Sequence, residues 1–292
     1  MTYDISKLNA AVAQAAAEST NLSEASAGGG GTYVPPAAGN CVATLVGYID
    51  LGLRVKKGYQ GAKDTQVRQG MFIFELSKGK NAPKVLEDGT KVPHRITVKV
   101  WLPAAGKKPS DKSGFFKLFS KLNHNKDPDV KIPAQLLGKH WRVTVAHEEW
   151  TPAGSSEAIT TANIGNAKDG YNIFPPVASV LDEETGDMRD VVIPPSEVLS
   201  PIRCFLWEYA DKGMWDSLFI DGEYPAKVDD KGNETAPAKT KNVLQEQIKQ
   251  ALDWKGSPMQ QILEDGGELD TAEVAEVKEQ PSVEDDPLAG ML

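Results

Sequence analysis

Cysteine is scarce in this chain. Only Cys41 and Cys204 occur among 292 residues, far apart and without a CxxC pattern. This excludes a disulfide framework, argues against a structural zinc site and fits a reducing compartment. The histidines are also few and show no metal-ligand spacing: His94, His124, His140 and His147. The sequence therefore predicts neither a metal site nor a cofactor.

Long apolar runs and enzyme motifs are missing as well. No stretch of about 18 apolar residues occurs, so no membrane span is expected, and the N-terminus has no secretory pattern. A Ser-His-Asp elbow, a GxxxxGK[ST] loop and an HExxH motif are all absent. Lys168-Asp169-Gly170 is one residue short of the KxDG motif of nucleotidyl ligases. We expect a protein that is not an enzyme and has no catalytic residues.

The charges that are present are distributed unevenly. Between Arg54 and Arg142 there are 20 Lys and Arg against 7 Asp and Glu, a net charge of +13. The whole chain nevertheless carries −9, because residues 264–292 contain ten acidic residues and a single lysine. A basic body joined to an acidic, apolar-tipped tail is the feature that a function has to explain.

The basic body has the pattern of a small β-barrel. Residues 41–53, 67–77, 92–102, 138–147 and 158–164 are strand-like, and Gly47 inside the first indicates a bulge. Asp88-Gly89 predicts a turn, and Ser113 is a candidate cap of a short helix between the third and fourth strands. Three strands, a helix and two strands is the order of an OB fold, a five-stranded barrel, although the alternation alone does not fix which barrel forms.

Four regions follow from this pattern. Residues 1–31 are Ala- and Gly-rich and predict a flexible arm, 32–176 the OB-fold domain, 177–263 an α-rich appendage packed on the barrel, and 264–292 a disordered acidic tail. Within the appendage, Ser200-Pro201 predicts a helix, residues 215–220 a strand, and Asn242 and Ser257 the starts of two further helices. The predicted fold class is mainly β with an α appendage.

Nucleic acid is the partner that the basic body favours. Lys and Arg displace counterions from phosphates, and aromatic rings stack on bases at about 1–3 kcal/mol per base. The candidates lie in the basic loop after the first strand and on the polar faces of the third and fourth strands, whereas the pattern does not tell which face of the second strand is buried. They are Lys56, Lys57, Tyr59, Lys63, Arg68, Arg95, Lys99, Trp101 and Arg142. A merely solubilising role for the lysines, and a buried role for Trp101, stay open. Trp141 shares a face with Val143 and Val145 and is expected in the core.

Several short sequence segments resemble the single-stranded DNA-binding proteins of tailed bacteriophages. They are ATLVGYIDLG (43–52), YQG (59–61), MFIFEL (71–76), LLGKHWRVTV (136–145), FLWEYADKGMWDSLFIDGEY (205–224) and KNVLQEQIKQAL (241–252). The resemblance spans about residues 40–258 and implies an OB fold, sequence-independent binding of single-stranded DNA, and an acidic C-terminus that recruits replication or recombination proteins. The chain departs from the family pattern by closing on Leu-Ala-Gly-Met-Leu, without an aromatic residue after the acids.

These observations predict a phage-type protein that coats single strands during DNA replication or recombination, in the cytoplasm of an infected bacterium. Its tail would dock on a polymerase, helicase or primase through Glu284, Asp285, Asp286, Leu288 and Leu292. Homo-oligomer formation and the choice between DNA and RNA stay open. Two alternatives remain: a structural or protein-interaction module of the phage particle, and an accessory domain of a nuclease or ligase.

Overall fold

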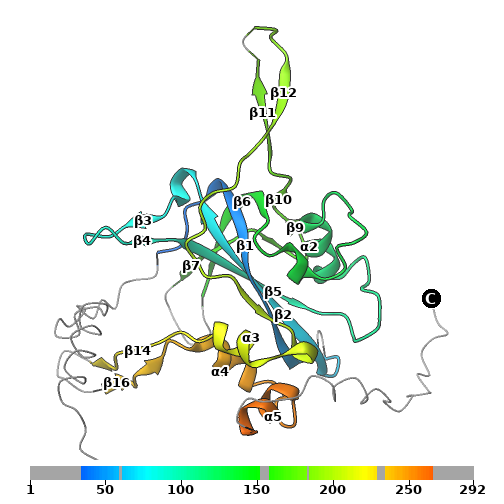
Figure 1. Cartoon of the computed structure of the whole chain (residues 1–292), viewed down its shortest axis with the longest axis vertical. Coiled ribbons are helices and arrows are strands. Elements are labelled where there is room, and N and C mark those ends of the chain that lie inside the picture. Colours follow the sequence, from blue (N-terminus) through cyan, green and yellow to red (C-terminus); the bar gives the residue numbers. More distant parts are fainter. Residues whose placement is uncertain (1–33, 59–60, 152–157, 183, 229–233, 266–292) are drawn as a thin grey trace, which may run out of the picture. The chain divides into compact units, whose positions relative to one another are not determined.

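The computed structural model describes residues 34–58, 61–151, 158–182, 184–228 and 234–265 (Figure 1). Tyr59 and the tail residues proposed for docking lie outside this part. The chain divides into two compact units, one of which contains residues 221–241. In that unit, β14 (Glu223–Tyr224) pairs with β17 (Lys239–Thr240), and β15 (Lys227–Val228) pairs with β16 (Glu234–Ala236). The rest of the description concerns residues 36–220 and 242–265.

The larger unit is mainly β, with a large sheet and a few short helices. The strands of its main sheet are β1 (Gly39–Lys56), β2 (Thr65–Ser77), β5 (His94–Trp101), β6 (His140–Trp150), β7 (Ile159–Asn163), β10 (Ile173–Phe174) and β13 (Arg203–Phe205). Three separate hairpins are β3 (Lys84–Val85) with β4 (Lys91–Val92), β8 (Gly165–Asn166) with β9 (Gly170–Tyr171), and β11 (Val177–Leu181) with β12 (Met188–Val192). The α-helices are α2 (Gly114–Leu122), α3 (Lys212–Ser217), α4 (Val243–Lys249) and α5 (Pro258–Glu264), and short 3-10 turns are η1 (Gly79–Asn81), η2 (Pro133–Leu136) and η3 (Trp207–Tyr209).

Strand β1 organises the sheet, whose path runs β10-β6-β1-β2-β5. On one side β1 pairs antiparallel with β2 over nearly its whole length. Its other side is shared: β6 pairs with the first third of the strand, and β13 runs parallel to Gly47–Ile49. β7 pairs with β6 and lies near β5, but among the described residues no backbone ladder joins the two, so the sheet does not close.

One face of the sheet packs on a core, which the alternating pattern predicts for β5 and β6 but leaves open for β2. Phe72, Phe74, Ile96, Trp141 and Val143 are all buried there with α2. The indole N–H of Trp141 donates to the carbonyl oxygen of Leu122 at 3.0 Å, which satisfies the polar atom of a buried ring. The expectation that Trp141 is a core residue is confirmed, as are helix α2 and its cap, since Ser113 Oγ accepts the N–H of Phe116.

The opposite face, which we call the outer face, packs on a second core. Ile49, Leu51 and Met71 of the sheet lie against Phe205, Trp207, Trp215, Ile248 and Met259 of the C-terminal segments. Backbone bonds secure this layer to β1, because Leu252 N–H donates to Leu53 O and Leu53 N–H donates to Asp253 Oδ1. The C-terminal segments are therefore a structural layer of the same unit.

Two predictions in this region are wrong. Residues 203–205 form strand β13 instead of the helix expected after Ser200-Pro201, because they pair with the part of β1 that β6 leaves uncovered. Residues 212–217 form helix α3 where a strand was expected from residue 215, since Asp211 accepts the N–H of Met214 and caps a helix there. In both places a long-range partner or a cap outweighs the local spacing of apolar residues.

In the part of the chain with described coordinates, we find no helix that is long and apolar enough to cross a bilayer.

Candidate nucleic-acid interface

Strand β5 presents the polar side chains that the alternation predicts. Arg95 and Lys99 are exposed and Trp101 is half-buried, whereas Ile96 and Val100 between them are buried in the inner core. Because Trp101 pairs with Gln69 and Lys99 with Met71, the polar residues of β5 share the outer face with that stripe of β2. The grouping of Arg95, Lys99 and Trp101 on one face is thus confirmed.

The middle of this outer face is not open to a nucleic-acid strand. Helix α4 lies over it, and Lys99 Nζ donates to Gln247 Oε1 of that helix at 2.9 Å. Burial, and secondarily the charge of Arg54, lowers the pKa of Lys99. The apolar stripe at Val243, Leu244 and Ile248 signals a packing helix in the sequence, but it does not tell which surface of the sheet the helix covers.

Arg68 is held by carboxylates. Its guanidinium lies 2.6 Å from Glu208, 3.3 Å from Asp50 and 3.4 Å from Asp253, and it stacks 5.4 Å from the ring centroid of Trp207. Three acidic partners and an aromatic ring satisfy this charge within the protein. We therefore assign Arg68 to anchoring the outer layer and no longer count it among the phosphate ligands.

Arg54, just outside the predicted set, has a similar structural role. Its guanidinium donates to the backbone carbonyls of Gln247 and Gln250 at the C-terminal end of α4. A cation at this end interacts favourably with the unsatisfied carbonyls and the helix dipole.

Arg142 lies in a basic and aromatic cluster. Its guanidinium is 5.5 Å from the ring centroid of Phe174, its neighbour across the β6–β10 pair, and Lys121 Nζ of α2 is 5.7 Å from the same centroid. Lys121 and Phe174 were not among the predicted site residues. Only the tertiary structure brings them together, because 53 positions of the sequence separate them.

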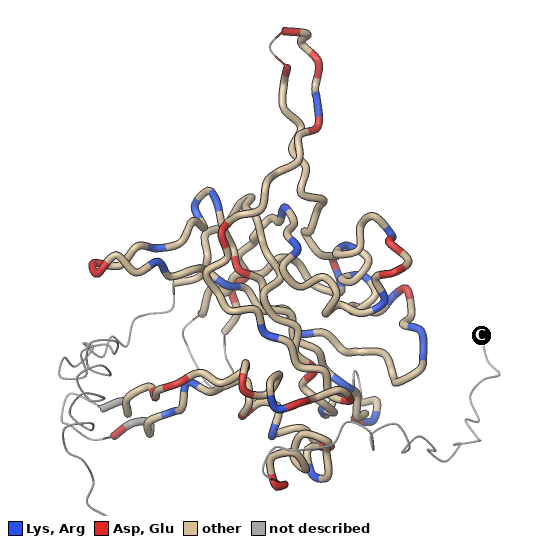
Figure 2. Tube along the Cα trace, in the orientation of Figure 1, with Lys and Arg blue, Asp and Glu red and all other residues tan. Residues whose placement is uncertain are grey.

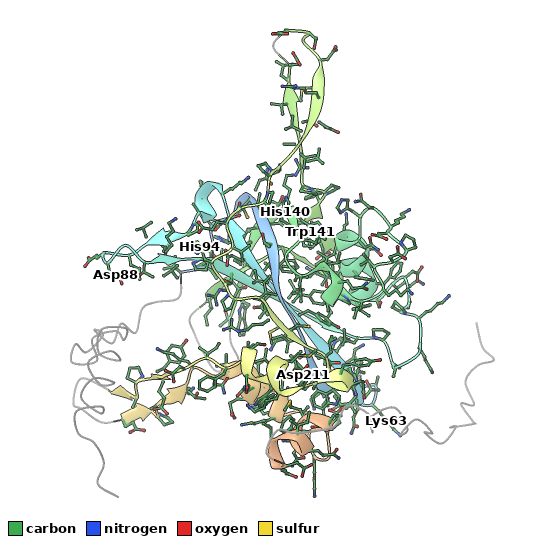
Figure 3. All side chains as sticks on the ribbon, viewed as in Figure 1. Lys63, Asp88, His94, His140, Trp141 and Asp211 are labelled. Atoms are coloured by element: carbon green, nitrogen blue, oxygen red, sulfur yellow. The ribbon has the colours of Figure 1, made fainter. Side chains whose placement is uncertain are left out.

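A group of exposed cations lies where β2 begins and β5 ends. Lys56, Lys57 and Lys63 belong to the β1–β2 hairpin, and Lys107, Lys108 and Lys112 to the loop after β5. The two segments leave the sheet at the same end, since Leu102 N–H donates to Arg68 O. We call these six lysines the basic end; Figure 2 colours them blue, and Lys63 is labelled in Figure 3.

The lysines of the basic end are nearly free of acidic partners. Among the described residues, the structure records an ion pair for one of the six, Lys57 with Asp64 at 2.7 Å. The hydrogen bond from Lys57, followed by that from the Gly58 N–H, lowers the pKa of Asp64. Both partners are well exposed, and such pairs contribute little to stability, so a phosphate can compete for Lys57.

The described residues contain no cluster of three or more His, Cys, Asp or Glu side chains arranged for a metal ion. Comparisons with protein-family models, with curated proteins and with solved structures found no match for this chain.

Proposed function

We propose that this protein binds single-stranded DNA without sequence preference, in phage DNA replication or recombination. The basic end is the observation that supports this most directly, because its lysines are exposed and, among the described residues, only Lys57 has an acidic partner, which leaves them suited to phosphates. The half-buried Trp101 stands at the end of β5 next to this region and is the proposed stacking ring.

An OB-type barrel is part of the same proposal. The order β1, β2, β5, α2, β6, β7 matches three strands, a helix and two strands, and β7 approaches the edge strand β5. In an OB fold the ligand crosses the face of the second and third strands. Here α4 covers the middle of that face. We therefore place the nucleic-acid strand at the uncovered end of the face, across the β1–β2 hairpin and the loop after β5.

Replacing Lys56, Lys57 and Lys63 together by glutamine tests this proposal. The triple variant should bind oligo-dT at least tenfold more weakly at low salt, because each lost phosphate contact removes counterion release. The slope of log K against log salt should become shallower by about 2, at roughly 0.7 per contact on single strands. Tryptophan fluorescence titration at several salt concentrations measures both quantities.

The matched control replaces three lysines at the other side of the unit, Lys80, Lys84 and Lys91, near the β3–β4 hairpin whose tip carries Asp88 (Figure 3). It removes the same charge but should change affinity much less. Equal losses in both triple variants would show that only the overall charge matters and would refute a localised interface.

A second candidate function is a protein-interaction module, and the β11–β12 hairpin favours it. This hairpin projects from the sheet in Figure 1 and exposes Val180, Leu181, Met188, Val191 and Val192. Exposed apolar side chains gathered on one element are typical of protein-binding surfaces. Failure to bind oligo-dT, together with association with phage particles that is lost when Leu181 and Met188 are changed to Ser, would select this function.

A further inference from the structure

A cavity of about 150 Å³ lies between the outer face of the sheet and the layer that covers it. Val46, Ile73 and Leu244 form apolar walls, and the polar lining includes Arg95, Ser200 and Arg203. An engineered protein cavity of about this volume holds benzene, so a single small ion or group fits. About 20 Å along β5 separates Arg95 from Trp101, at roughly 3.3 Å per residue, and the cavity is therefore distinct from the basic end.

Two arginines meet in this cavity. Arg203 is half-buried and donates from Nε to the carbonyl oxygen of Ser217 at 3.0 Å, which leaves its terminal nitrogens available. For Arg95 the structure records no hydrogen bond or ion pair within the described residues. Burial, and then the charge of Arg95, lowers the pKa of Arg203, so the two guanidinium groups repel each other. Arg203 is partly buried and Arg95 is exposed at the rim, so an anion between the two guanidinium groups would relieve their repulsion.

Ser200 adds an unpartnered hydroxyl. The residue is only 5 % exposed and lines the cavity, yet its Oγ has no hydrogen-bond partner in the described structure. Buried polar groups are rarely left without one. Its backbone N–H, in contrast, has a partner, because it donates to Glu75 Oε2 at 2.6 Å.

Glu75 is the acidic group that faces Arg95 across the β2–β5 pair. The Leu199 and Ser200 N–H groups each donate to one of its carboxylate oxygens, and the structure records no ion pair between Glu75 and either arginine. One carboxylate against two guanidinium groups leaves the neighbourhood cationic. The role of Glu75 is to hold residues 199–200 in place, which presents Ser200 to the cavity.

We propose that this cavity binds a phosphate group, with Arg95 and Arg203 donating to its oxygens and the Ser200 hydroxyl completing the set. Guanidinium groups bind tetrahedral oxyanions through charge-assisted, often paired hydrogen bonds. Two sources share this chemistry, inorganic phosphate and the terminal phosphate of a nucleic-acid strand. The site is independent of the basic end and does not rest on the proposed function.

Calorimetric titration of the full chain with inorganic phosphate, at constant ionic strength set by chloride, tests the site. We expect saturable binding of one phosphate. Arg95→Gln and Arg203→Gln should each weaken it at least tenfold, since a hydrogen bond to a charged group is lost, and Ser200→Ala should weaken it several-fold. Arg189→Gln in β12, which removes one guanidinium group outside the cavity, is the matched control and should leave phosphate affinity unchanged. No saturable binding, or equal losses in the control, would overturn the proposal.

Arg95→Gln is the decisive variant, because Arg95 is exposed and its replacement should not impair folding. A second titration compares oligo-dT carrying a 5′-phosphate with the same strand ending in a hydroxyl. A preference for the phosphorylated strand that disappears in Arg95→Gln assigns the site to strand ends. Equal affinity for both strands, with phosphate binding intact, assigns it to the free ion. The first titration contains no DNA, so its result is separate from success or failure of DNA binding.

Discussion

Arg68 and Lys63 illustrate how little a basic residue type says about its role. Both belong to the same basic stretch of sequence: Lys63 directly precedes Asp64, and Arg68 follows it by four positions. Lys63 is exposed at the tip of a hairpin, whereas Arg68 contacts Asp50, Glu208 and Asp253. Two of these partners lie at least 140 residues away, so no local pattern could reveal them.

The two cysteines differ in the same way. Cys41 is only 5 % exposed, and burial raises the pKa of its thiol to about 11, against a smaller opposing effect of a hydrogen bond with Asn81. Cys204 is half-buried, and burial followed by the charge of Asp211 raises its pKa as well.

We predict that Cys204 reacts with a thiol reagent at pH 8 in the native protein and that Cys41 reacts only after unfolding, because the thiolate is the nucleophile. Reagent kinetics on Cys41→Ser and Cys204→Ser assign each rate. Equal rates for the two thiols in the native protein would contradict this assignment of burial.

A pH dependence of stability follows from the same thiol. The pKa of Cys41 is raised on folding, so its protonated form is favoured in the native state. That contribution is complete below pH 9 and is lost as the pH rises from 9 to 11, by about 2–3 kcal/mol at 1.36 kcal/mol per pKa unit. Urea unfolding should show a smaller loss over this range for Cys41→Ala than for the unchanged protein.

At the scale of the element, strand β1 contains two bulges, of which the sequence predicts one. The bulge that Gly47 indicates is confirmed, as a register shift between Leu45 and Gly47. A second shift between Asp50 and Leu53 places Gly52 at a φ of +73° directly beneath the outer layer. Neither the second bulge nor its contact with Trp207 could be inferred from glycine alone.

Gly52→Ala should therefore be strongly destabilising. A Cβ atom at this position would lie 2.4 Å from the Trp207 ring and 2.6 Å from Ala251 Cβ, in addition to the strain of a positive φ. We expect a loss of about 2–5 kcal/mol, from roughly 1–2 for the left-handed conformation and about 1–3 for overpacking. Chemical denaturation measures it.

Gly89→Ala is the matched control for this prediction. Its φ is +81°, and a Cβ atom there would meet nothing within 4 Å. It should cost only the conformational part, about 1–2 kcal/mol. If both variants lose the same free energy, the close approach of the outer layer to β1 at Gly52 is wrong.

At the scale of the whole molecule, charge is separated along the chain. The tail carries −9, equal to the net charge of the complete protein, so the other residues are neutral in sum although the sheet region is basic. Under the proposed function, we expect the acidic segment to compete with DNA for the basic end, because opposite charges attract over about a Debye length of 10 Å at 0.1 M salt.

Ending the chain after Asp265 keeps helix α5 and removes most of this charge, a net −7 from eight acidic residues and one lysine. We expect the truncated protein to bind oligo-dT several-fold more tightly at low salt, with the difference shrinking as salt rises. Titration of both forms at two salt concentrations checks this. Unchanged affinity at low salt would restrict the tail to a role in docking partner proteins.

The sequence by itself determined five strands of the sheet, the inner-core position of Trp141, helix α2 and the uneven distribution of charge. These follow from side-chain periodicity and composition, which depend on neighbours a few residues apart. Only the tertiary structure decided which face of the sheet the C-terminal segments cover, where Arg68 finds its partners, and that Arg95, Ser200 and Arg203 line one cavity. Those features depend on contacts between residues about 100–200 positions apart, which the spacing of apolar and polar residues along a short segment does not predict.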